Sequence, residues 1–277
     1  MAGSGAFQIS AHGVSDVGMR RDHNEDSFLV DLDLGLLIIA DGMGGHAGGE
    51  HASKLAVETI QREVRAARES NGGAFERPTG IEDSPLPDVM RQAVEAASAA
   101  IFEAAQADPE LSGMGTTVTA ALIDGSHAFV AHVGDSRCYL LREGKIYQVS
   151  EDHSLVNEQI KAGAISPEEA RTSRFKNIIT RSVGFERTVA VDLMGIELQA
   201  GDQFVVCCDG LSNMVEDGEI LSIAEADPIV EAAERLVALA NERGGDDNIT
   251  VVVARVDPPP GDAAAPPPTG NTDTQGE

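Results

Sequence analysis

The chain twice carries the same pattern, a short apolar run that leads into an aspartate followed by glycine. Residues 36–40 lead directly into Asp41, and residues 204–208 lead directly into Asp209. Short apolar runs bounded by glycine are typical of buried strands. A carboxylate at the end of a core strand is poorly solvated, so ionising it is costly. Several such carboxylates at one rim of a sheet are understandable if a cation lies between them.

Apolar runs and turn residues divide the chain into expected strands and helices. The expected strands cover residues 7–14, 27–34, 36–40, 116–123, 127–133, 137–141, 145–149, 204–208 and 249–256. Helical spacing predicts helices over 50–68, 89–107 and 154–162, one that begins at Ser166, and one from 227 to about 244. Strands follow one another more often than they alternate with helices, which favours an α+β layered fold with two antiparallel sheets. A mixed α/β sheet is the alternative.

The net charge limits the classes of partner. The formal charge of −26 argues against nucleic acid and anionic membranes, since both attract surfaces rich in Lys and Arg. The same field repels a substrate that carries phosphate. A site for such a substrate therefore needs local metal ions and an arginine.

The three cysteines and the lack of a long apolar segment indicate the compartment. Cys138, Cys207 and Cys208 give no disulfide framework, and the simplest interpretation is reduced structural thiols in a cytosolic protein. Cys207 and Cys208 are neighbours in an expected core strand and should point to opposite faces. No apolar run approaches the ~18 residues of a membrane span, and residues 1–15 do not have the order of a signal peptide. We therefore expect a soluble, cytoplasmic protein.

A change of composition at Pro258 divides the chain into an expected folded domain, residues 1–257, and a tail, residues 258–277. The tail combines proline triplets, small residues and acids with no Lys or Arg, which is typical of disorder. Within the domain, residues 71–87 are rich in Gly, Pro and charge and are expected to form an exposed loop.

Four acidic clusters lie at expected strand boundaries, and a weaker fifth joins them. They cover residues 21–26, 41–46, 208–210 and 244–248, with 134–136 as the fifth. Oxygen ligands alone suit Mg²⁺ or Mn²⁺, whereas His and Cys are not grouped at the spacing of a zinc site. A carboxylate shared by two metal ions, with water between them, would supply a nucleophile without a serine or cysteine.

Each of these residues also has an ordinary explanation when it is taken alone. An aspartate is usually solvated or caps a turn, and Asp-Gly pairs are common in turns. His46 lies in a Gly-rich stretch and Arg21 is a single charge, so both are expected at the surface by default. The joint arrangement, in which apolar strands lead to several acids, is what favours a functional site.

Six segments in a fixed order carry a resemblance to a known family. They are residues 18–26 (GMRRDHNED), 40–46 (ADGMGGH), 134–137 (GDSR), 177–184 (NIITRSVG), 208–211 (CDGL) and 247–250 (DNIT). On these segments the chain resembles the metal-dependent protein phosphatase (PPM) family, the type-2C serine/threonine phosphatases, in its compact bacterial form. The resemblance covers residues 7–256, which leaves out little but the tail.

The resemblance implies a fold and a metal centre. The fold would be a four-layer α-β-β-α sandwich, with two antiparallel sheets flanked by helices. Two ions, Mn²⁺ or Mg²⁺, would lie at one end of it, and Asp41 would bridge them. The carbonyl of Gly42 and a water held by Glu25 would complete one site, and Asp209 and Asp247 would hold the other.

Further roles follow from the same resemblance. Asp135 and Asp209 would offer a third, weaker metal site. Arg21 would clamp the substrate phosphate, because its guanidinium fork fits phosphate oxygens. Asp26 would support the water bound to the metals, and residues 152–182 would form a small flap beside the site.

The general acid is left open by the sequence. In animal members of the family, a histidine directly follows the Asp-Gly and is the proposed acid. Here residues 43–45 intervene before His46. His46 and a metal-bound water are therefore alternatives.

The activity implied is hydrolysis of phosphoserine and phosphothreonine in proteins by a metal-activated water, opposite Ser/Thr kinases in bacterial signalling. The expected partners are phosphoproteins and such kinases, and the expected state is a monomer. Three other readings compete: a sensor domain that has lost catalysis, a phosphatase for a small metabolite, and a calcium-binding structural protein. The first would lack the metal-binding acids, which are present here, and the last would need an EF-type loop, which the sequence lacks.

Overall fold

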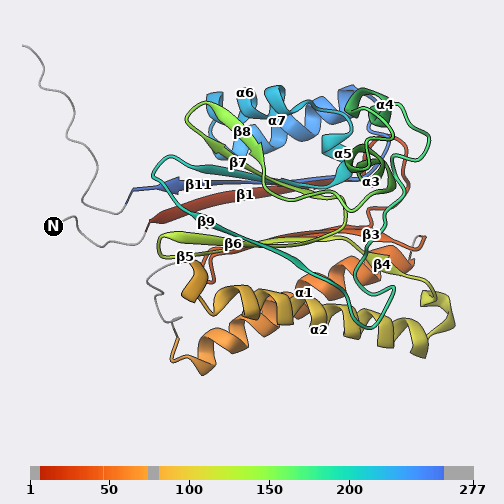
Figure 1. Cartoon of the computed structure of the whole chain (residues 1–277), viewed down its shortest axis with the longest axis horizontal. Helices are drawn as coiled ribbons and strands as arrows, with labels where there is room; N and C mark the ends of the chain where they lie inside the picture. Colours follow the sequence, from red (N-terminus) through yellow and green to blue (C-terminus); the bar gives the residue numbers. More distant parts are fainter. Residues whose placement is uncertain (1–6, 46, 74–80, 259–277) are drawn as a thin grey trace, which may run out of the picture.

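Two antiparallel sheets face each other across the middle of the molecule (Figure 1). The structure is a computed structural model and describes residues 7–45, 47–73 and 81–258. Its strands are β1 (Gln8–Asp16), β2 (Asp26–Asp31), β3 (Leu36–Met43), β4 (Gly115–Thr116), β5 (Val118–Asp124), β6 (His127–Val133), β7 (Arg137–Arg142), β8 (Lys145–Gln148), β9 (Asp192–Glu197), β10 (Gln203–Cys207) and β11 (Ile249–Asp257). One sheet has the order β1-β11-β10-β7-β8. The other has the order β2-β3-β5-β6-β9, with β4 paired to β3.

Helices cover the outer face of each sheet. The described helices are α1 (Ala47–Ser70), α2 (Leu86–Ala107), α3 (Leu155–Lys161), α4 (Pro167–Arg171), α5 (Asp209–Ser212), α6 (Asp217–Ala226) and α7 (Ile229–Glu242), with short 3₁₀ turns η1 (Ile81–Asp83) and η2 (Pro109–Leu111). Helices α1 and α2 lie on the sheet that contains β3, and α6 and α7 lie on the sheet that contains β10 (Figure 1). All strand pairs among the described residues are antiparallel. The expected α-β-β-α sandwich is therefore confirmed, and the mixed sheet is excluded.

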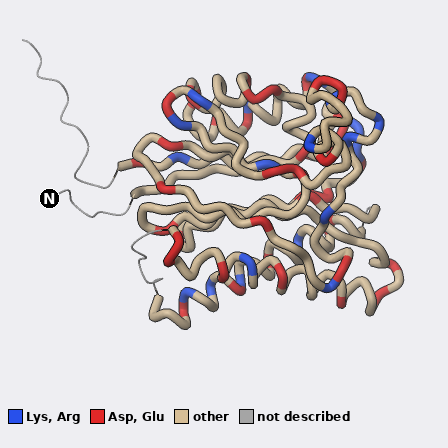
Figure 2. Tube along the Cα trace, viewed as in Figure 1, with Lys and Arg blue, Asp and Glu red and all other residues tan. Residues whose placement is uncertain are grey.

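Alternation along each strand divides the apolar side chains among three cores. In β3, Leu36 and Ile38 pack under α1 and α2, whereas Leu37 and Ile39 pack between the sheets. A strand that is apolar on both faces is expected where both faces are covered, and this explains the unbroken apolar runs in the sequence. Figure 2 shows the charged residues mainly on the helices and at the strand ends, with the middle of both sheets almost free of them.

The cysteines follow the same alternation. Cys207 packs on the helix side of its sheet and Cys208 packs between the sheets, which confirms that the two point to opposite faces. All three cysteines are buried and unbridged. Among the described residues, no helix combines the length and apolarity that crossing a membrane requires.

The structure differs from the sequence-based expectation at several places. Strand β9 and helix α6 were not expected, and β3 continues through Asp41 to Met43 instead of ending before the aspartate. Strand β9 is an edge strand with only partly buried side chains, so its sequence lacks the apolar run of a core strand. The expected exposed loop 71–87 ends before residue 86, because α2 begins at Leu86, and its residues 74–80 lie outside the described residues. Residues 259–277 of the expected tail lie outside the described residues.

We predict that Phe204→Ala lowers the free energy of unfolding by about 3–5 kcal/mol. Phe204 is fully buried between the sheets, and truncation leaves a cavity that the rigid strands cannot close. Urea denaturation measures the change. The matched control is Phe185→Ala at a side chain that is 68% exposed, where we expect a change within about 0.5 kcal/mol. Equal losses in the two variants would contradict the assigned core.

Candidate metal centre

Carboxylates from five parts of the chain meet at one end of the sandwich. Asp26 begins β2, Asp41 lies near the end of β3, and Asp135 lies in the turn between β6 and β7. Asp209 begins α5, two residues after the end of β10, and Asp247 lies two residues before β11. This is the end at which Figure 1 shows α5, α3 and the end of β3 close together. The sequence-predicted acids are thus brought to one place.

Strand register directs two of these carboxylates into the space between the sheets. Asp26 pairs directly with Asp41 across β2 and β3. Asp41 shares its face of β3 with Ile39, and Asp26 shares its face of β2 with Phe28, and both of these apolar residues belong to the core between the sheets. The interior face that is apolar along most of each strand therefore ends in acids.

Threonines hold the backbone of Asp41 in place. The Asp41 N–H donates to Thr117 Oγ1 at 3.0 Å, and the Asp41 carbonyl accepts from the Thr117 N–H at 2.8 Å and from Thr116 Oγ1 at 2.9 Å. Thr117 Oγ1 also lies 2.8 Å from Ser136 Oγ, beside Asp135. These threonines were not identified from the sequence, because a buried Thr in a strand looks like any β-branched residue.

Both Asp-Gly pairs need glycine because other backbone passes close by. A Cβ at Gly42 would lie 2.2 Å from the carbonyl oxygen of Gly49 and 2.5 Å from that of Glu25. A Cβ at Gly210 would lie 1.9 Å from the carbonyl oxygen of Asn248. The glycines therefore allow segments from distant parts of the chain to converge on the acids.

Asn248 joins these segments and was missed as a functional residue. Its Nδ2 donates to the carbonyls of Val17 and His23, both at 2.9 Å, and its Oδ1 accepts from the Glu25 N–H at 2.8 Å. The Glu25 carboxylate is directed at the start of α1, since a Cβ at Gly49 would lie 1.9 Å from Glu25 Oε2. Asn248 belongs to the cluster 244–248 and to the segment 247–250 identified in the sequence, but no role was predicted for it, because its hydrogen-bond partners lie more than 200 residues away in the sequence.

The crowding shows in the pKa values of the carboxyls. Burial raises the pKa of Asp26 to about 7 and, together with the charge of Asp247, the pKa of Asp209 to about 6. Burial and neighbouring acids raise the pKa of Asp41 well above its usual range, and the acids that act on it are Asp26, Asp209, Asp135 and Asp247. Asp41 thus lies within reach of every other acid in the cluster. Burial, followed by Asp209, also raises the pKa of Asp135.

Several buried carboxylate oxygens have no partner within the protein. Thr250 Oγ1 donates to Asp26 Oδ2 at 2.6 Å, but Asp26 Oδ1, Asp135 Oδ1 and Asp209 Oδ1 have no hydrogen-bond partner. Ligand atoms of Asp26, Asp41 and Cys208 lie within 4.8 Å of one another. Buried carboxylate oxygens without a partner fit hard divalent cations, which would both neutralise the charge and satisfy the oxygens.

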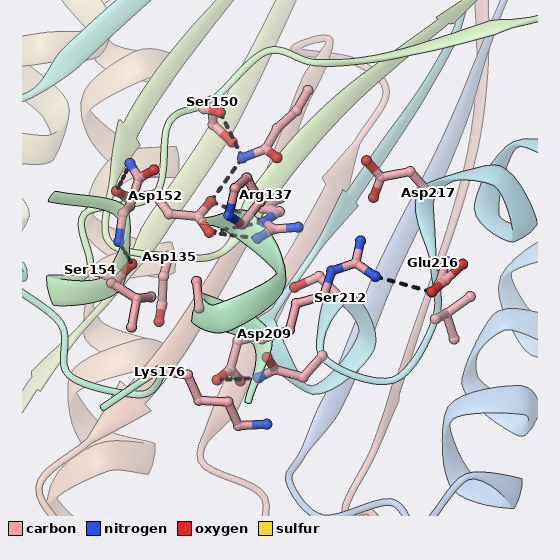
Figure 3. A pocket seen from close by; sticks show the side chains of 18 of the residues that line it. Asp135, Arg137, Ser150, Asp152, Ser154, Lys176, Asp209, Ser212, Glu216 and Asp217 are labelled. Atoms are coloured by element: carbon pink, nitrogen blue, oxygen red, sulfur yellow. Dashed lines mark hydrogen bonds and ion pairs between the residues drawn. The ribbon is translucent and has the colours of Figure 1, made fainter. Parts of the chain in front are cut away.

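Two positive side chains reach the cluster. Arg21 Nη2 donates to Asp247 Oδ2 at 2.7 Å, and half of the Arg21 side chain is exposed. Lys176 lies beside Asp209 (Figure 3), and its charge, with that of Arg21, opposes the rise in the pKa of Asp209. Lys176 was missed because nothing in its sequence neighbourhood distinguishes it from a surface lysine. His46 lies outside the described residues.

A groove of about 980 Å³ leads away from Asp135 and Asp209 (Figure 3). Helices α3 and α4 line one side of it, and α5 and the start of α6 line the other. Asp152 lies deeper in the groove, where Arg137 donates to both of its carboxylate oxygens. At the mouth, Arg171 of α4 makes an exposed ion pair of 3.1 Å with Glu216. The acids thus lie at the end of a polar groove large enough for several residues of a peptide.

Known phosphatases are similar to this chain over most of its length. Residues 19–251 match the family model described as protein phosphatase 2C. The serine/threonine protein phosphatase PstP of Mycobacterium tuberculosis is 39% identical over 246 residues, which are 87% of this chain and 44% of PstP. The chain thus spans less than half of that relative. The serine/threonine phosphatase stp of Listeria welshimeri is 36% identical over 244 residues, 86% of this chain and 92% of that protein.

Solved structures give the same result. The crystal structure of M. tuberculosis PstP/Ppp superposes with a TM-score of 0.81 at 37% identity, covering 90% of this chain and 99% of that one. The catalytic domain of PstP in complex with two manganese ions gives a TM-score of 0.79 at 37% identity, covering 91% and 100%.

The raised pKa values predict how the metal-free protein responds to pH. A carboxyl whose pKa rises on folding binds its proton more tightly in the folded chain, so its stabilising contribution is present at low pH and is lost as the pH rises to the folded pKa. For Asp26 this window runs from 3.8 to about 7. We expect the free energy of unfolding in EDTA to fall between pH 5 and 7.5, and to fall by roughly 1–3 kcal/mol less in Asp26→Asn. Urea denaturation at both pH values measures this, and identical pH dependence in the two proteins would contradict the raised pKa.

Proposed function

The chain belongs to the protein phosphatase 2C family, and on that premise we propose that it is a metal-dependent protein serine/threonine phosphatase. It hydrolyses phosphoserine and phosphothreonine in proteins, opposite Ser/Thr kinases in bacterial signalling. The observation that supports this most directly is the crowding of Asp26, Asp41, Asp135 and Asp209, whose pKa values are all raised. Crowded, buried carboxylates are costly to ionise, and cations bound between them would offset that cost.

We assign the metal ligands as follows. Asp41, the Gly42 carbonyl and, through a water, Glu25 would hold one ion, and Asp41, Asp209 and Asp247 would hold the other. The proximity of Asp41 to all of the other acids supports the bridging role. When bound, Mn²⁺ or Mg²⁺ supplies positive charge for the phosphoryl oxygens and lowers the pKa of a water. Asp135, beside Asp209, offers a third and weaker site.

Arg21 and Asp26 then have separate tasks. Arg21 donates a hydrogen bond from Nη2 to Asp247. Its guanidinium carries further N–H donors that can bind phosphate oxygens. Thr250 Oγ1 donates to one carboxylate oxygen of Asp26. The other oxygen is buried and unpartnered, and it can accept a hydrogen bond from a water. The proton for the leaving oxygen comes from His46 or from a water.

The groove favours a protein as substrate over a small metabolite. A phosphoryl group fills only a small part of its volume of about 980 Å³. The rest can take the residues that flank the phosphorylated one, between the flap and the α5–α6 side. By the flap we mean residues 152–182, which contain α3 and α4. We propose that residues 1–257 form the catalytic domain, and that the protein acts as a cytoplasmic monomer.

The first test is release of phosphate from a phosphothreonine peptide. We expect release with Mn²⁺ and loss of release in excess EDTA. In Asp209→Ala we expect kcat to fall by about a thousandfold, because the variant removes a ligand to the metals. The circular dichroism of this variant should be unchanged. Glucose 6-phosphate is the parallel substrate. Turnover of the sugar phosphate alone would favour a metabolite phosphatase, and no turnover of either by the folded protein would favour a sensor domain.

Arg21→Ala should raise KM for the phosphopeptide about tenfold and change kcat less, because the lost hydrogen bonds bind the phosphate in ground and transition states alike. Steady-state kinetics separates the two parameters. The matched control is Arg20→Ala, because Arg20 is the adjacent residue, its side chain is exposed, and its ion pair with Asp246 is long, at 3.9 Å. An unchanged KM in Arg21→Ala would contradict the role of Arg21 in binding the substrate phosphate.

A further inference from the structure

His153 lies at the point where the flap leaves the sandwich, and it is bonded to the turn that carries Asp135. The side chain is buried. Its backbone N–H donates to the carbonyl of Gly134 at 2.7 Å, and the Gly134 N–H donates in return to His153 Nδ1 at 3.0 Å. Gly134 is therefore held at both of its backbone polar groups by a single residue.

Gly134 depends on such a partner. Its φ is +117°, in the region that favours glycine, and a Cβ there would lie 2.6 Å from Cβ of Thr117. The residue therefore has no side chain that could anchor the turn, and glycine is the residue with the greatest backbone freedom to lose. The contacts with His153 restrict that freedom at the residue directly before Asp135.

The hydrogen bonds determine which nitrogen of His153 carries the proton. A backbone N–H can only donate, so Nδ1 is the acceptor and the proton is on Nε2. Nε2 lies 3.1 Å from Asp192 Oδ2 at the start of β9. Asp192 also accepts from Arg181, near the end of the flap.

The same residue holds the other end of the flap. The His153 carbonyl accepts from the Thr180 N–H at 2.8 Å, and the next residues continue the contact, since the Leu155 N–H donates to the Ile178 carbonyl at 2.8 Å. The ring of His132 packs against the ring of His153 with centroids 4.9 Å apart. Burial lowers the pKa of both histidines, and that of His132 falls to about 4, so both rings are neutral at neutral pH.

We propose that His153 is a positioning residue that fixes the Gly134–Asp135 turn through Nδ1 and ties it to the flap through Nε2 and Asp192. Through this link the approach of the Asp135 carboxylate to Asp209 is coupled to the position of the flap. The inference rests on the proposed function in one respect, the role of Asp135 as a metal ligand. The link itself consists of hydrogen bonds that do not involve the metals.

Two variants separate the two nitrogens. In His153→Asn, the amide oxygen lies near the place of Nδ1 and can accept from Gly134, but the side chain is too short to reach Asp192. In His153→Gln, the amide nitrogen lies near the place of Nε2 and can donate to Asp192, but no acceptor faces Gly134. Each variant therefore keeps one contact and loses the other.

The first readout is amide hydrogen exchange in the metal-free protein. We expect exchange of the Gly134 amide to accelerate at least tenfold in His153→Gln and to stay within about threefold of the native rate in His153→Asn, since about 1.4 kcal/mol corresponds to a factor of ten. The Thr180 amide bonds the main-chain carbonyl of residue 153, which both variants keep, and we expect its exchange to be faster in His153→Asn only because loss of the Asp192 contact loosens this end of the flap. Equal acceleration in both variants would show a general loss of packing and would overturn the proposal, and so would native exchange in both.

The second readout is binding of Mn²⁺, followed by calorimetric titration, with Asp135→Asn as the reference. We expect His153→Gln to weaken the site that Asp135→Asn removes by about ten- to a hundredfold, as for other residues that orient metal ligands, and His153→Asn to retain it. Loss of this site in Asp135→Asn, with native binding in His153→Gln, would overturn the proposal. If Asp135→Asn binds Mn²⁺ like the native protein, the metal role of Asp135 fails instead, and the exchange of Gly134 still decides whether His153 holds the turn.

Discussion

The rest of the structure depends on carboxylates that are crowded at the end of an apolar core. The space between the sheets is closed by apolar side chains along most of its length, and at one end the same strand faces carry Asp26 and Asp41. Burial and mutual repulsion raise the pKa values of these acids, so the protein holds them together only by restraints that act elsewhere. The paired threonines at Asp41, the glycines after Asp41 and Asp209, and Asn248 are such restraints. Three packed cores supply the stability that offsets the cost.

The layered fold could be predicted from sequence because both sheets are covered on both faces. Strands such as β3 and β10 then contain unbroken apolar runs, residues 36–40 and 204–207, which stand out from the polar segments around them. Strand β9 could not be predicted on this basis, since it is an edge strand and pairs through its backbone with β6 alone. Helix α6 was missed for a different reason: it begins at Asp217-Gly218, which reads as a turn, and its capping box is formed by two glutamates, Glu216 and Glu219, with no Ser or Thr.

The candidate site could be predicted only as far as residue type indicates chemistry. Acids and an arginine at strand boundaries indicate a site for metals and phosphate by their residue type and position. The structure brings together those of them that it describes. Asn248, Thr117 and His153 act by bonding the backbone of segments that are distant in sequence, and such partners follow from the tertiary structure alone. From the sequence, His153 is indistinguishable from a histidine that only packs in the core, and its role follows from the partners of its two ring nitrogens.

For the proposed function, the strongly negative chain has to attract a phosphate, and the local charges offer a way to do so. Cations held between the acids would reverse the sign of the field at the point where a phosphoryl group would bind. The protein adds Arg21 from the loop before β2 and Lys176 from the flap, and both lie close enough to Asp209 to oppose the rise in its pKa. The sheets therefore supply the negative charge that collects the cations, and two peripheral segments supply the positive charge of the protein itself. One of these segments is the flap. The link that His153 makes between the flap and Asp135 therefore connects a segment that carries positive charge to one that carries negative charge.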